Sequence, residues 1–393
     1  MSASGIPAPR SAYVHIPFCA SKCGYCDFNS YPGLQELYDG YVDALIVEIR
    51  RAAGECRPDG GLETLYLGGG TPTVLTVNQL ALIAKAVKGE LGLAADAEVT
   101  VEANPGTVDW PMLARLPAVG FNRLSLGVQS LDDGLLRVLG RAHTSRQALE
   151  TFRIARQTGW KNIGIDLMFA LPGQTMSGWR DTLEAGVALN PEHVSLYELS
   201  IEEGTAFARD PELLSGDLRL PDESLRLGMY ELAIRVLTGA GYEHYEVSNF
   251  ARPEFRSRHN QLYWRNEPYY GFGAGATSYV GGVRARRIAQ PADYIDAVRS
   301  GGDAVESSER LSGRALLGET VALGLRTLDG IDIPALSARL GVDLSAELAE
   351  GIDRLRKRGL IALDDGRLRV THAGLLVLDD VAREFIVSQP EAS

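Results

Sequence analysis

Short apolar runs alternate with longer amphipathic segments over the first 240 residues of the chain. The apolar runs have the length and branched side chains of buried strands, and they read SAYVHIP, TLYLGGG, EVTVEAN, RLSLGVQ, NIGIDLMFA and HVSLYELS. Between them, segments such as LQELYDGYVDALIVEIRRAA and SRQALETFRIARQTG carry apolar residues at helical spacing. This alternation predicts an α/β fold in which parallel strands are joined by right-handed crossover helices.

Six such strand–helix units predict an open, partial (β/α)6 barrel. In barrels of this kind the chemistry lies at the carboxyl ends of the strands. Glycine and polar residues that are unusual for a hydrophobic core occur in or after the second to sixth predicted strands. They are Gly68–Pro72 after the second strand, Glu102 and Gln129 at the ends of the third and fourth, Asp166 in the fifth and Tyr197 in the sixth. We therefore expect a functional site at that end of the barrel.

The regular alternation of predicted strands and helices ends after residue 240. We expect the chain to have three parts, at residues 1–240, 241–305 and 306–393. The middle part is an α/β extension rich in aromatic residues, glycine and arginine. In the last part, LRKRGLIALDDGRLRVTHAGLLVLDDVAREF predicts a helix, two short strands about a tight turn and a helix, the outline of a winged helix. Such a domain either binds nucleic acid or packs as a lid, and its short basic cluster at residues 354–358 favours packing.

Composition narrows the class of protein. Of the 393 residues, 45% are hydrophobic and 23% are charged, which is typical of a globular chain. The net charge of −12 lacks the basic footprint of a nucleic-acid-binding protein, so no nucleic-acid partner is expected. No apolar run approaches the length of a membrane span, and MSASGIPAPRSAY lacks the apolar core of a signal peptide. The expected location is the cytoplasm, with peripheral contact with a membrane left open.

Three of the four cysteines, Cys19, Cys23 and Cys26, lie within eight residues. In a reducing compartment such a cluster indicates metal binding or catalysis. A structural zinc site would need a fourth ligand, for which His15 has the wrong spacing, and a thioredoxin-type pair would leave Cys19 unexplained. A [4Fe–4S] cluster held by three thiolates would leave one iron open for another ligand. Cys56 stands alone and is expected to be a free thiol in a loop.

The spacing CxxxCxxC followed by an aromatic residue resembles the signature of the radical S-adenosylmethionine (SAM) superfamily. That resemblance implies a [4Fe–4S] cluster on the three cysteines and SAM at the open iron, and GGGTP resembles the stretch that binds the amino group of SAM. Core packing is the alternative for the two tyrosines that flank the cysteines. The residues expected around SAM are Tyr13, Tyr25, Gly69, Gly70, Thr71, Glu102, Gln129, Arg141 and Asp166.

Seven stretches together resemble the oxygen-independent coproporphyrinogen III oxidase-like proteins over nearly the whole chain. They are YVHIPFC, GGGTP, VEANP, SLGVQS, GRAH, DLMFALPGQT and HVSLYEL. The true oxidases of this family carry a further cysteine two residues after the third and a long N-terminal extension. This sequence has Phe28 at that place and only 18 residues before Cys19. In both features it resembles the HemW-type haem chaperone branch instead.

HNQLYW, residues 259–264, resembles the HNxxYW haem-binding signature of that branch. His259 is the candidate iron ligand, followed by Asn260, while Tyr263 and Trp264 are expected to pack on the macrocycle. Between residues 251 and 288 the net charge is +5, and arginine suits carboxylates. The arginines expected near haem propionates are Arg256, Arg258 and Arg265. Without the resemblance, His259 could equally cap a turn.

The resemblance implies a chaperone that carries a [4Fe–4S] cluster and SAM and passes haem to an acceptor protein. A reductant protein such as a flavodoxin or ferredoxin is then an expected partner. The alternative is a true enzyme, either a coproporphyrinogen III oxidase or a related radical SAM methyltransferase. The intact set of cofactor residues leaves turnover of SAM open.

Overall fold

The structure, a computed structural model, describes residues 8–216 and 218–386. Its largest sheet has nine strands: β1 (Ser11–Ile16), β4 (Leu62–Gly69), β5 (Leu93–Ala103), β6 (Arg123–Gln129), β7 (Ile163–Phe169), β8 (His193–Glu198), β9 (Glu243–Glu246), β10 (Asn249–Ala251) and β11 (Tyr270–Phe272). Their order across the sheet is β11-β1-β4-β5-β6-β7-β8-β10-β9. The six strands β1 and β4 to β8 are parallel neighbours, which confirms the predicted partial barrel.

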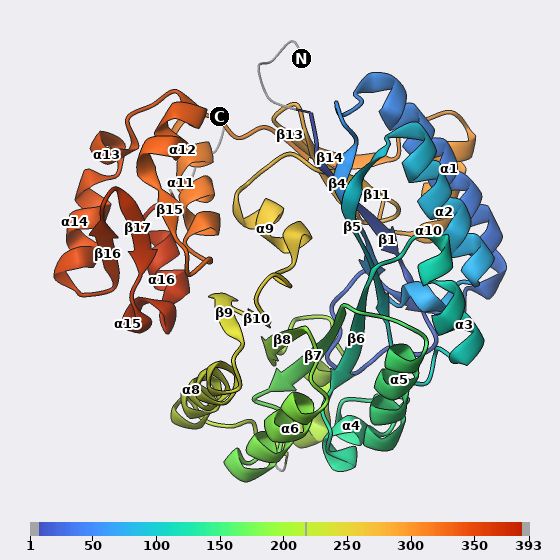
Figure 1. Cartoon of the computed structure of the whole chain (residues 1–393), viewed down its shortest axis with the longest axis horizontal. Helices are drawn as coiled ribbons and strands as arrows, with labels where there is room; N and C mark the ends of the chain where they lie inside the picture. Colours follow the sequence, from blue (N-terminus) through green and yellow to red (C-terminus); the bar gives the residue numbers. More distant parts are fainter. Residues whose placement is uncertain (1–7, 217, 387–393) are drawn as a thin grey trace.

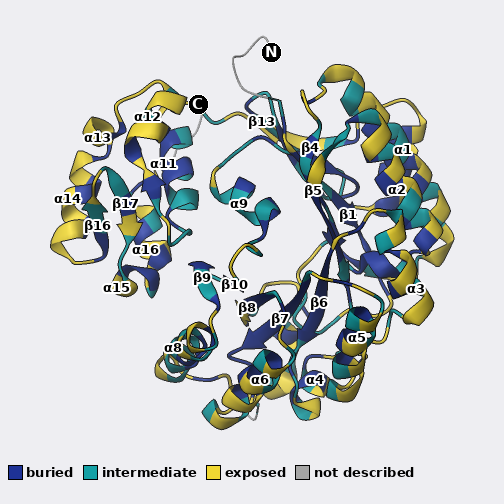
Figure 2. Ribbon diagram, viewed as in Figure 1, coloured by how far each residue is buried: buried dark blue, intermediate teal, exposed yellow. Residues whose placement is uncertain are grey.

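Helices cover the convex side of this curved sheet (Figure 1). They are α1 (Tyr38–Glu55), α2 (Val77–Glu90), α3 (Trp110–Arg115), α4 (Asp133–Val138), α5 (Ser145–Gln157), α6 (Met176–Ala188) and α8 (Glu223–Gly239). Local side chains determine where some of them begin, because Thr76 and Thr144 form capping boxes with Gln79 and Gln147 at the starts of α2 and α5. The strands are buried while the outer faces of the helices are exposed (Figure 2).

The two faces of the parallel sheet differ in chemistry. Leu65 and Leu67 of β4 and Val99 and Val101 of β5 belong to the main hydrophobic core. The alternate positions are polar and contact one another across strands, as Tyr66 does with a carboxylate of β5. Since successive side chains of a strand point to opposite faces, the concave face of the barrel is polar. A barrel interior is more often filled by branched aliphatic residues.

The extension adds strands to both edges of the barrel. Strand β11 pairs in parallel with β1, while β10 and β9 continue the other edge in antiparallel orientation. A second sheet has the order β12-β13-β14. Its strands are β12 (Thr277–Val280), β13 (Val283–Arg287) and β14 (Val305–Glu309). The helices of this region are α9 (Arg258–Trp264) and α10 (Pro291–Arg299). Helix α9 lies on the concave side of the barrel (Figure 1).

The last part of the chain has its own hydrophobic core, which includes Leu317, Leu355 and Phe385. Its elements are α11 (Gly313–Gly324), β15 (Ile331–Asp332), α12 (Ile333–Leu340), α13 (Leu344–Glu347), α14 (Ala349–Lys357), β16 (Ile361–Asp364), β17 (Arg367–Val370), α15 (His372–Leu375) and α16 (Leu378–Arg383). The order of helices and strands, with a hairpin of β16 and β17, is that of a winged helix. The basic residues at the end of α14 face acidic partners, since Arg354 and Arg358 pair with Glu384.

Among the residues that the structure describes, no helix combines the length and the apolar character needed to cross a membrane.

Candidate cofactor site

The three clustered cysteines lie on a loop that is fixed at several points. Short strands β2 (Phe18–Cys19) and β3 (Tyr31–Pro32) pair and close its base. Inside the loop, the ammonium of Lys22 donates hydrogen bonds to the carbonyls of Phe28 and Ser30, at 3.3 and 3.2 Å. At its tip, Gly24 donates to the carbonyl of Leu139 and accepts from the amide of Phe207. Hydrogen bonds within the loop and to neighbouring segments therefore hold it in place.

Each of the three thiols contacts a polar group of the protein. Thr71 Oγ1 lies 3.6 Å from Cys19 Sγ, Arg141 Nη1 lies 3.5 Å from Cys23 Sγ, and Ser30 Oγ lies 3.8 Å from Cys26 Sγ. Burial raises the pKa of Cys19 and of Cys26 above the usual value of a thiol. Their thiolates consequently need a cation to stabilise them, and a bound metal supplies one.

The spread of these thiols distinguishes between the metal centres considered above. Within residues 8–216 and 218–386, no three His, Cys, Asp or Glu side chains are close enough to hold a single metal ion. His15, the fourth ligand that a zinc site would need, contacts Tyr13 and the carbonyl of Asn29 through its two ring nitrogens. A four-iron cluster takes its thiolates on different irons, so it suits this wider spacing better than zinc does.

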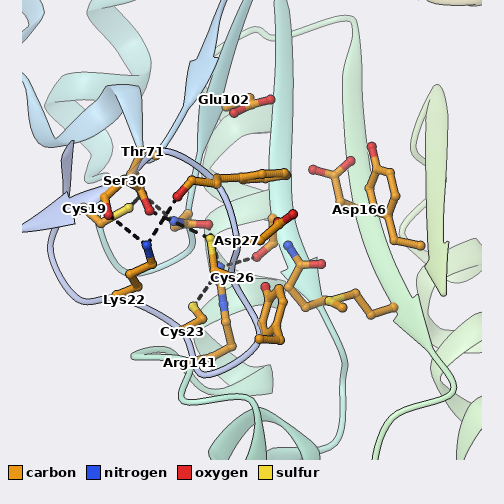
Figure 3. A pocket seen from close by; sticks show the side chains of 18 of the residues that line it. Cys19, Lys22, Cys23, Cys26, Asp27, Ser30, Thr71, Glu102, Arg141 and Asp166 are labelled. Atoms are coloured by element: carbon orange, nitrogen blue, oxygen red, sulfur yellow. Dashed lines mark hydrogen bonds between the residues drawn. The ribbon is translucent and has the colours of Figure 1, made fainter. Parts of the chain in front are cut away.

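A cavity of about 300 Å³ opens beside the thiols at the carboxyl ends of the barrel strands. Figure 3 shows the cysteines on one side of it and Asp166 on the other, with Glu102 above. The cavity brings together residues from the thiol loop, from the carboxyl ends of β4 to β8 and from the turn after α4. Those expected from the sequence that line it are Cys19, Cys23, Tyr25, Cys26, Gly69, Gly70, Thr71, Glu102, Gln129, Arg141 and Asp166.

Two glycines let the chain after β4 pass close to the thiol loop. A Cβ atom on Gly70 would lie 3.0 Å from Cys19 Sγ and 2.5 Å from the carbonyl of Phe18. Gly69 has a φ of +111°, and a Cβ there would lie 2.5 Å from the ring of His15. Because of these contacts, GGGTP can bring its backbone amides and carbonyls to the edge of the cavity.

Glu102 is held by two donors at the end of β5. Tyr66 donates to Oε1 at 2.6 Å, and the amide of Gly69 donates to Oε2 at 3.2 Å. Burial raises the pKa of Glu102 to about 7, although the bond from Tyr66 partly opposes that rise. A cationic group bound beside this carboxylate would favour its ionised form.

Two polar atoms at the cavity have no hydrogen-bond partner among the described residues, namely Gln129 Oε1 and Arg141 Nε. Gln129 also has a φ of +64°, an unusual conformation for a residue other than glycine. Arg141 is fixed by bonds from Nη2 to Asn104 Oδ1 and to the carbonyl of Gly127. Buried groups without partners are rare, and both of these residues line the cavity.

Asp166 completes the far wall of the cavity. Its two oxygens accept from Ser125 Oγ at 3.3 and 3.4 Å, and burial raises its pKa. Tyr25 lines the cavity and packs edge-on against Phe207. Tyr13, which was also expected near SAM, does not line the cavity. Its ring lies between those of His15 and Tyr66.

Asn104 belongs to the site although the sequence analysis did not single it out. It donates to Thr71 Oγ1 at 2.7 Å and accepts from Arg141. It therefore connects two stretches of the chain that were each expected to contact SAM. The available signal was its position in VEANP, directly after the strand that ends at Ala103.

The four residues singled out in HNQLYW lie on two faces of α9. His259 and Tyr263, four residues apart, contact each other at 3.2 Å through Nε2 and the hydroxyl. His259 is 2% exposed, its Nδ1 lies 2.7 Å from Thr64 Oγ1, and burial lowers its pKa to about 3. Both ring nitrogens are therefore engaged inside the barrel, and a haem at the surface would not reach them.

Asn260 and Trp264 share the other face of α9, because adjacent helical residues point about 100° apart. Trp264 borders a hollow of about 270 Å³ between α9 and the last domain, lined also by Ile331, Leu336 and Arg339. Its Nε1 is buried and has no hydrogen-bond partner in the described part of the chain. Tyr263 and Trp264 thus face different surroundings in this structure, and the packing of both against one porphyrin stays a prediction.

The local excess of arginine is largely neutralised by carboxylates, most of them from other parts of the chain. Arg256 pairs with Glu243 and Asp329, Arg258 pairs with Asp96, and Arg265 pairs with Glu267. The arginines of β13 pair in the same way with residues of α1, α11 and β14. A count of charges along the sequence does not show this compensation.

Comparison with known proteins identifies the family. The description "Radical SAM superfamily" matches residues 13–186, and "HemN C-terminal domain" matches residues 311–377. The chain is 36% identical to the heme chaperone HemW of Bacillus subtilis, over 96% of this chain and 99% of that protein. It is 37% identical to HemW of Lactococcus lactis, over 96% and 98% of the two chains. The chain belongs to the HemW family.

The chain is also similar to an animal protein and to a solved structure. A mouse protein, radical S-adenosyl methionine domain-containing protein 1, mitochondrial, is 37% identical over 98% of this chain and 90% of its own. The structure of coproporphyrinogen III oxidase (HemN) from Escherichia coli, a radical SAM enzyme, has a TM-score of 0.85 at 28% identity, covering 96% of this chain and 90% of that one. The family resemblance inferred from the sequence and the α/β radical SAM fold are both confirmed.

Proposed function

We propose that this protein is a haem chaperone that holds a [4Fe–4S] cluster on Cys19, Cys23 and Cys26 and binds SAM beside it. The observation that supports the cofactor assignment best is the convergence of three thiols and two unpartnered polar atoms on one cavity. When bound, the cluster and SAM together supply radical chemistry or a redox centre. The residues of the chain bind and orient the two groups.

The charges around the cavity match those of SAM. Its ammonium suits the carboxylate of Glu102, which accepts the amide of Gly69 at the edge of GGGTP. Its carboxylate suits the guanidinium of Arg141, which lines the cavity. Gln129 and Asp166 offer an amide and a carboxylate for the hydroxyl and amine groups of the nucleoside, and Tyr25 offers a ring.

An anaerobic spectroscopic experiment tests this assignment. The protein, reconstituted with iron and sulfide and then reduced, should give the electron paramagnetic resonance signal of a [4Fe–4S] cluster. Saturating SAM should change that signal, since SAM is expected to bind at the open iron. An unchanged signal at saturating SAM would refute the proposed binding mode.

Haem binding is proposed from the names of the relatives and from HNQLYW. Trp264 is half-buried and lines the hollow beside the last domain, and the half-buried Asn260 lies on the same face of α9. The partly exposed pairs of Arg256, Arg258 and Arg265 are weak, so a propionate can replace a carboxylate there at low cost. Ligation of iron by His259 stays a prediction, and it requires the ring to leave Thr64 and Tyr263.

The second candidate, a coproporphyrinogen III oxidase, is favoured by the likeness to the Escherichia coli enzyme. Against it stands Phe28, which is 62% exposed at the mouth of the cavity where the oxidases carry a further cysteine. Anaerobic conversion of coproporphyrinogen III to protoporphyrinogen IX, with SAM consumed in step, would establish the oxidase. We expect no such conversion. The proposed partners are a haem-acceptor protein and a small reductant protein such as a flavodoxin or ferredoxin, and the proposed location is the cytoplasm.

A further inference from the structure

His259 lies inside the barrel, where it contacts Tyr66 rather than the cavity itself. Its ring stacks on that of Tyr66, with centroids 5.1 Å apart and 28° between the planes. Three hydrogen-bonding contacts fix the position of His259. Its ring nitrogens contact the hydroxyls of Thr64 and Tyr263, and its backbone amide donates to Glu98. The carboxylate of Glu98 accepts the amides of Arg258 and His259, each at 3.1 Å, and so anchors the start of α9 to β5.

Tyr66 connects this ring to the cavity. On its other side it lies 6.1 Å from the ring of Tyr13, and its hydroxyl donates to Glu102 at 2.6 Å. Glu102 in turn accepts the amide of Gly69, where GGGTP begins to turn away from the strand. The contacts therefore run without a break from α9 to the carboxylate at the edge of the cavity.

We propose that His259 is a positioning residue of the SAM site, holding the ring of Tyr66 so that its hydroxyl fixes the carboxylate of Glu102. This inference rests on the proposed binding of SAM. A tyrosine on a concave sheet face can turn about its side-chain bonds, and two flanking rings restrict that freedom. Removal of the His259 ring leaves Tyr13 as the one ring packed against Tyr66 in the described structure, so the hydroxyl would sample other positions and Glu102 would lose its shortest hydrogen bond.

Four variants separate this role from a purely structural one. Tyr66→Phe keeps the stacked ring and removes only the bond to Glu102. His259→Ala removes the ring, His259→Gln keeps polar atoms without a ring, and His259→Phe keeps a ring without the polar atoms. The matched control is Tyr242→Phe, since Tyr242 is a buried tyrosine that donates to the carbonyl of Pro191 far from the cavity.

The measurement is the affinity for SAM of reconstituted, haem-free protein, by equilibrium dialysis, with cluster content checked by iron analysis. Tyr66→Phe and His259→Ala should each weaken binding roughly tenfold, the scale of one lost hydrogen bond to a charged group. His259→Phe should bind nearly as the wild type does, His259→Gln should resemble His259→Ala, and the control should be unchanged. The double variant Tyr66→Phe/His259→Ala should be no weaker than either single variant, because both break the same connection.

The outcomes are distinguishable from failure of the proposed function. If the wild-type protein contains a full cluster but binds no SAM, both the proposed binding of SAM and the positioning role of His259 are overturned. Wild-type binding with additive losses in the double variant, or with equal loss in His259→Phe and His259→Ala, overturns only the positioning role. If a His259 variant fails to fold, Tyr66→Phe with undiminished affinity still refutes the connection.

Discussion

Arg141 Nη1 donates a hydrogen bond to Cys23 Sγ across 3.5 Å, and so joins the turn after α4 to the thiol loop. The same guanidinium is fixed by Asn104 and by the carbonyl of Gly127. Its Nε is buried and has no hydrogen-bond partner in the described structure. One side chain thus contacts a proposed cluster ligand and also lines the cavity beside it.

This double contact predicts that Arg141→Lys will not preserve SAM binding. A lysine ammonium is a point charge and cannot bridge a thiol, an amide and a carboxylate in one plane. We expect affinity for SAM to fall at least about tenfold in Arg141→Lys, and further in Arg141→Ala. Arg153→Ala, which breaks only an exposed pair with Glu150, is the control. Wild-type affinity in Arg141→Lys would mean that the guanidinium does not contact the ligand.

The thiol assignment predicts a division among the four cysteines. Alanine variants of Cys19, Cys23 and Cys26 should each lose most of the bound iron and sulfide after anaerobic reconstitution. Cys56→Ala should keep both, since Cys56 lies at the end of α1, where its carbonyl accepts from Tyr270. Iron and sulfide analysis of the four variants checks this division. Equal loss of iron in Cys56→Ala and Cys23→Ala would contradict it.

The pKa of Glu102, raised by burial to about 7, predicts a pH dependence of SAM binding. The ionised carboxylate attracts the ammonium of SAM, so affinity should rise with pH through about 7 and level off above it. The groups that face this carboxylate and influence its charge are Tyr13, Tyr66, Arg123, Asp166 and Tyr197. Burial also raises the pKa of Asp166, so the variant Glu102→Gln is needed to assign the pH-dependent rise in SAM affinity to Glu102.

In Glu102→Gln the rise in SAM affinity near pH 7 should disappear. At pH 8.5, about 1.5 units above the pKa of Glu102, the variant should bind SAM much more weakly than the wild type does. Equilibrium dialysis across the pH range checks both expectations. A rise that persists in Glu102→Gln would move the assignment to another group.

The last domain supplies a stability prediction. A Cβ on Gly374 would overlap the carbonyl oxygen of Leu360, so the backbone would have to move. Gly374→Ala should destabilise this domain by more than about 2 kcal/mol. Gly89→Ala is the matched control, because a Cβ there meets nothing within 4 Å and alanine favours helix α2 by about 0.5–1 kcal/mol. Thermal unfolding followed by circular dichroism measures both. An equal effect of the two substitutions would contradict the packing described.

The barrel was predictable because the strand runs carry their signal in the local sequence. The same runs carry a second signal that the sequence analysis did not use. In TLYL, EVTVE and RLSLG every second residue is polar, which predicts a polar concave face rather than strands buried equally on both sides. Together with the parallel pairing of their strands, that alternation puts Tyr66 and Glu102 on the same face of the sheet.

The partners of individual side chains could not be predicted, because they depend on contacts between distant segments. HNQLYW identifies a family, but its helical spacing alone does not show which face is turned to the barrel. His259 meets Thr64, which lies 195 positions earlier in the chain. The arginines near it similarly pair with acids from α1, β9 and α11. Tertiary packing therefore decided whether these residues are accessible.

The two proposals for His259 make a joint prediction, because one imidazole cannot stack inside the barrel and bind haem iron at the surface. Haem ligation by His259 would break its bonds to Thr64 and Tyr263 and leave Tyr66 unsupported. Haem and SAM should then weaken each other's binding by the same factor, as thermodynamic linkage requires. We expect a factor of roughly ten, the effect assigned to loss of the Tyr66 bond.

Measurement of SAM affinity with and without saturating haem, and of haem affinity with and without SAM, checks this antagonism. His259→Ala should abolish it, since that variant has neither the stacked ring nor the iron ligand. Its haem complex should also show a shifted Soret band. Antagonism that survives in His259→Ala would place the contact between the two ligands elsewhere. Independent binding in the wild type, with a Soret band that His259→Ala leaves unchanged, would mean that haem is held by the face of Trp264 while His259 stays inside the barrel.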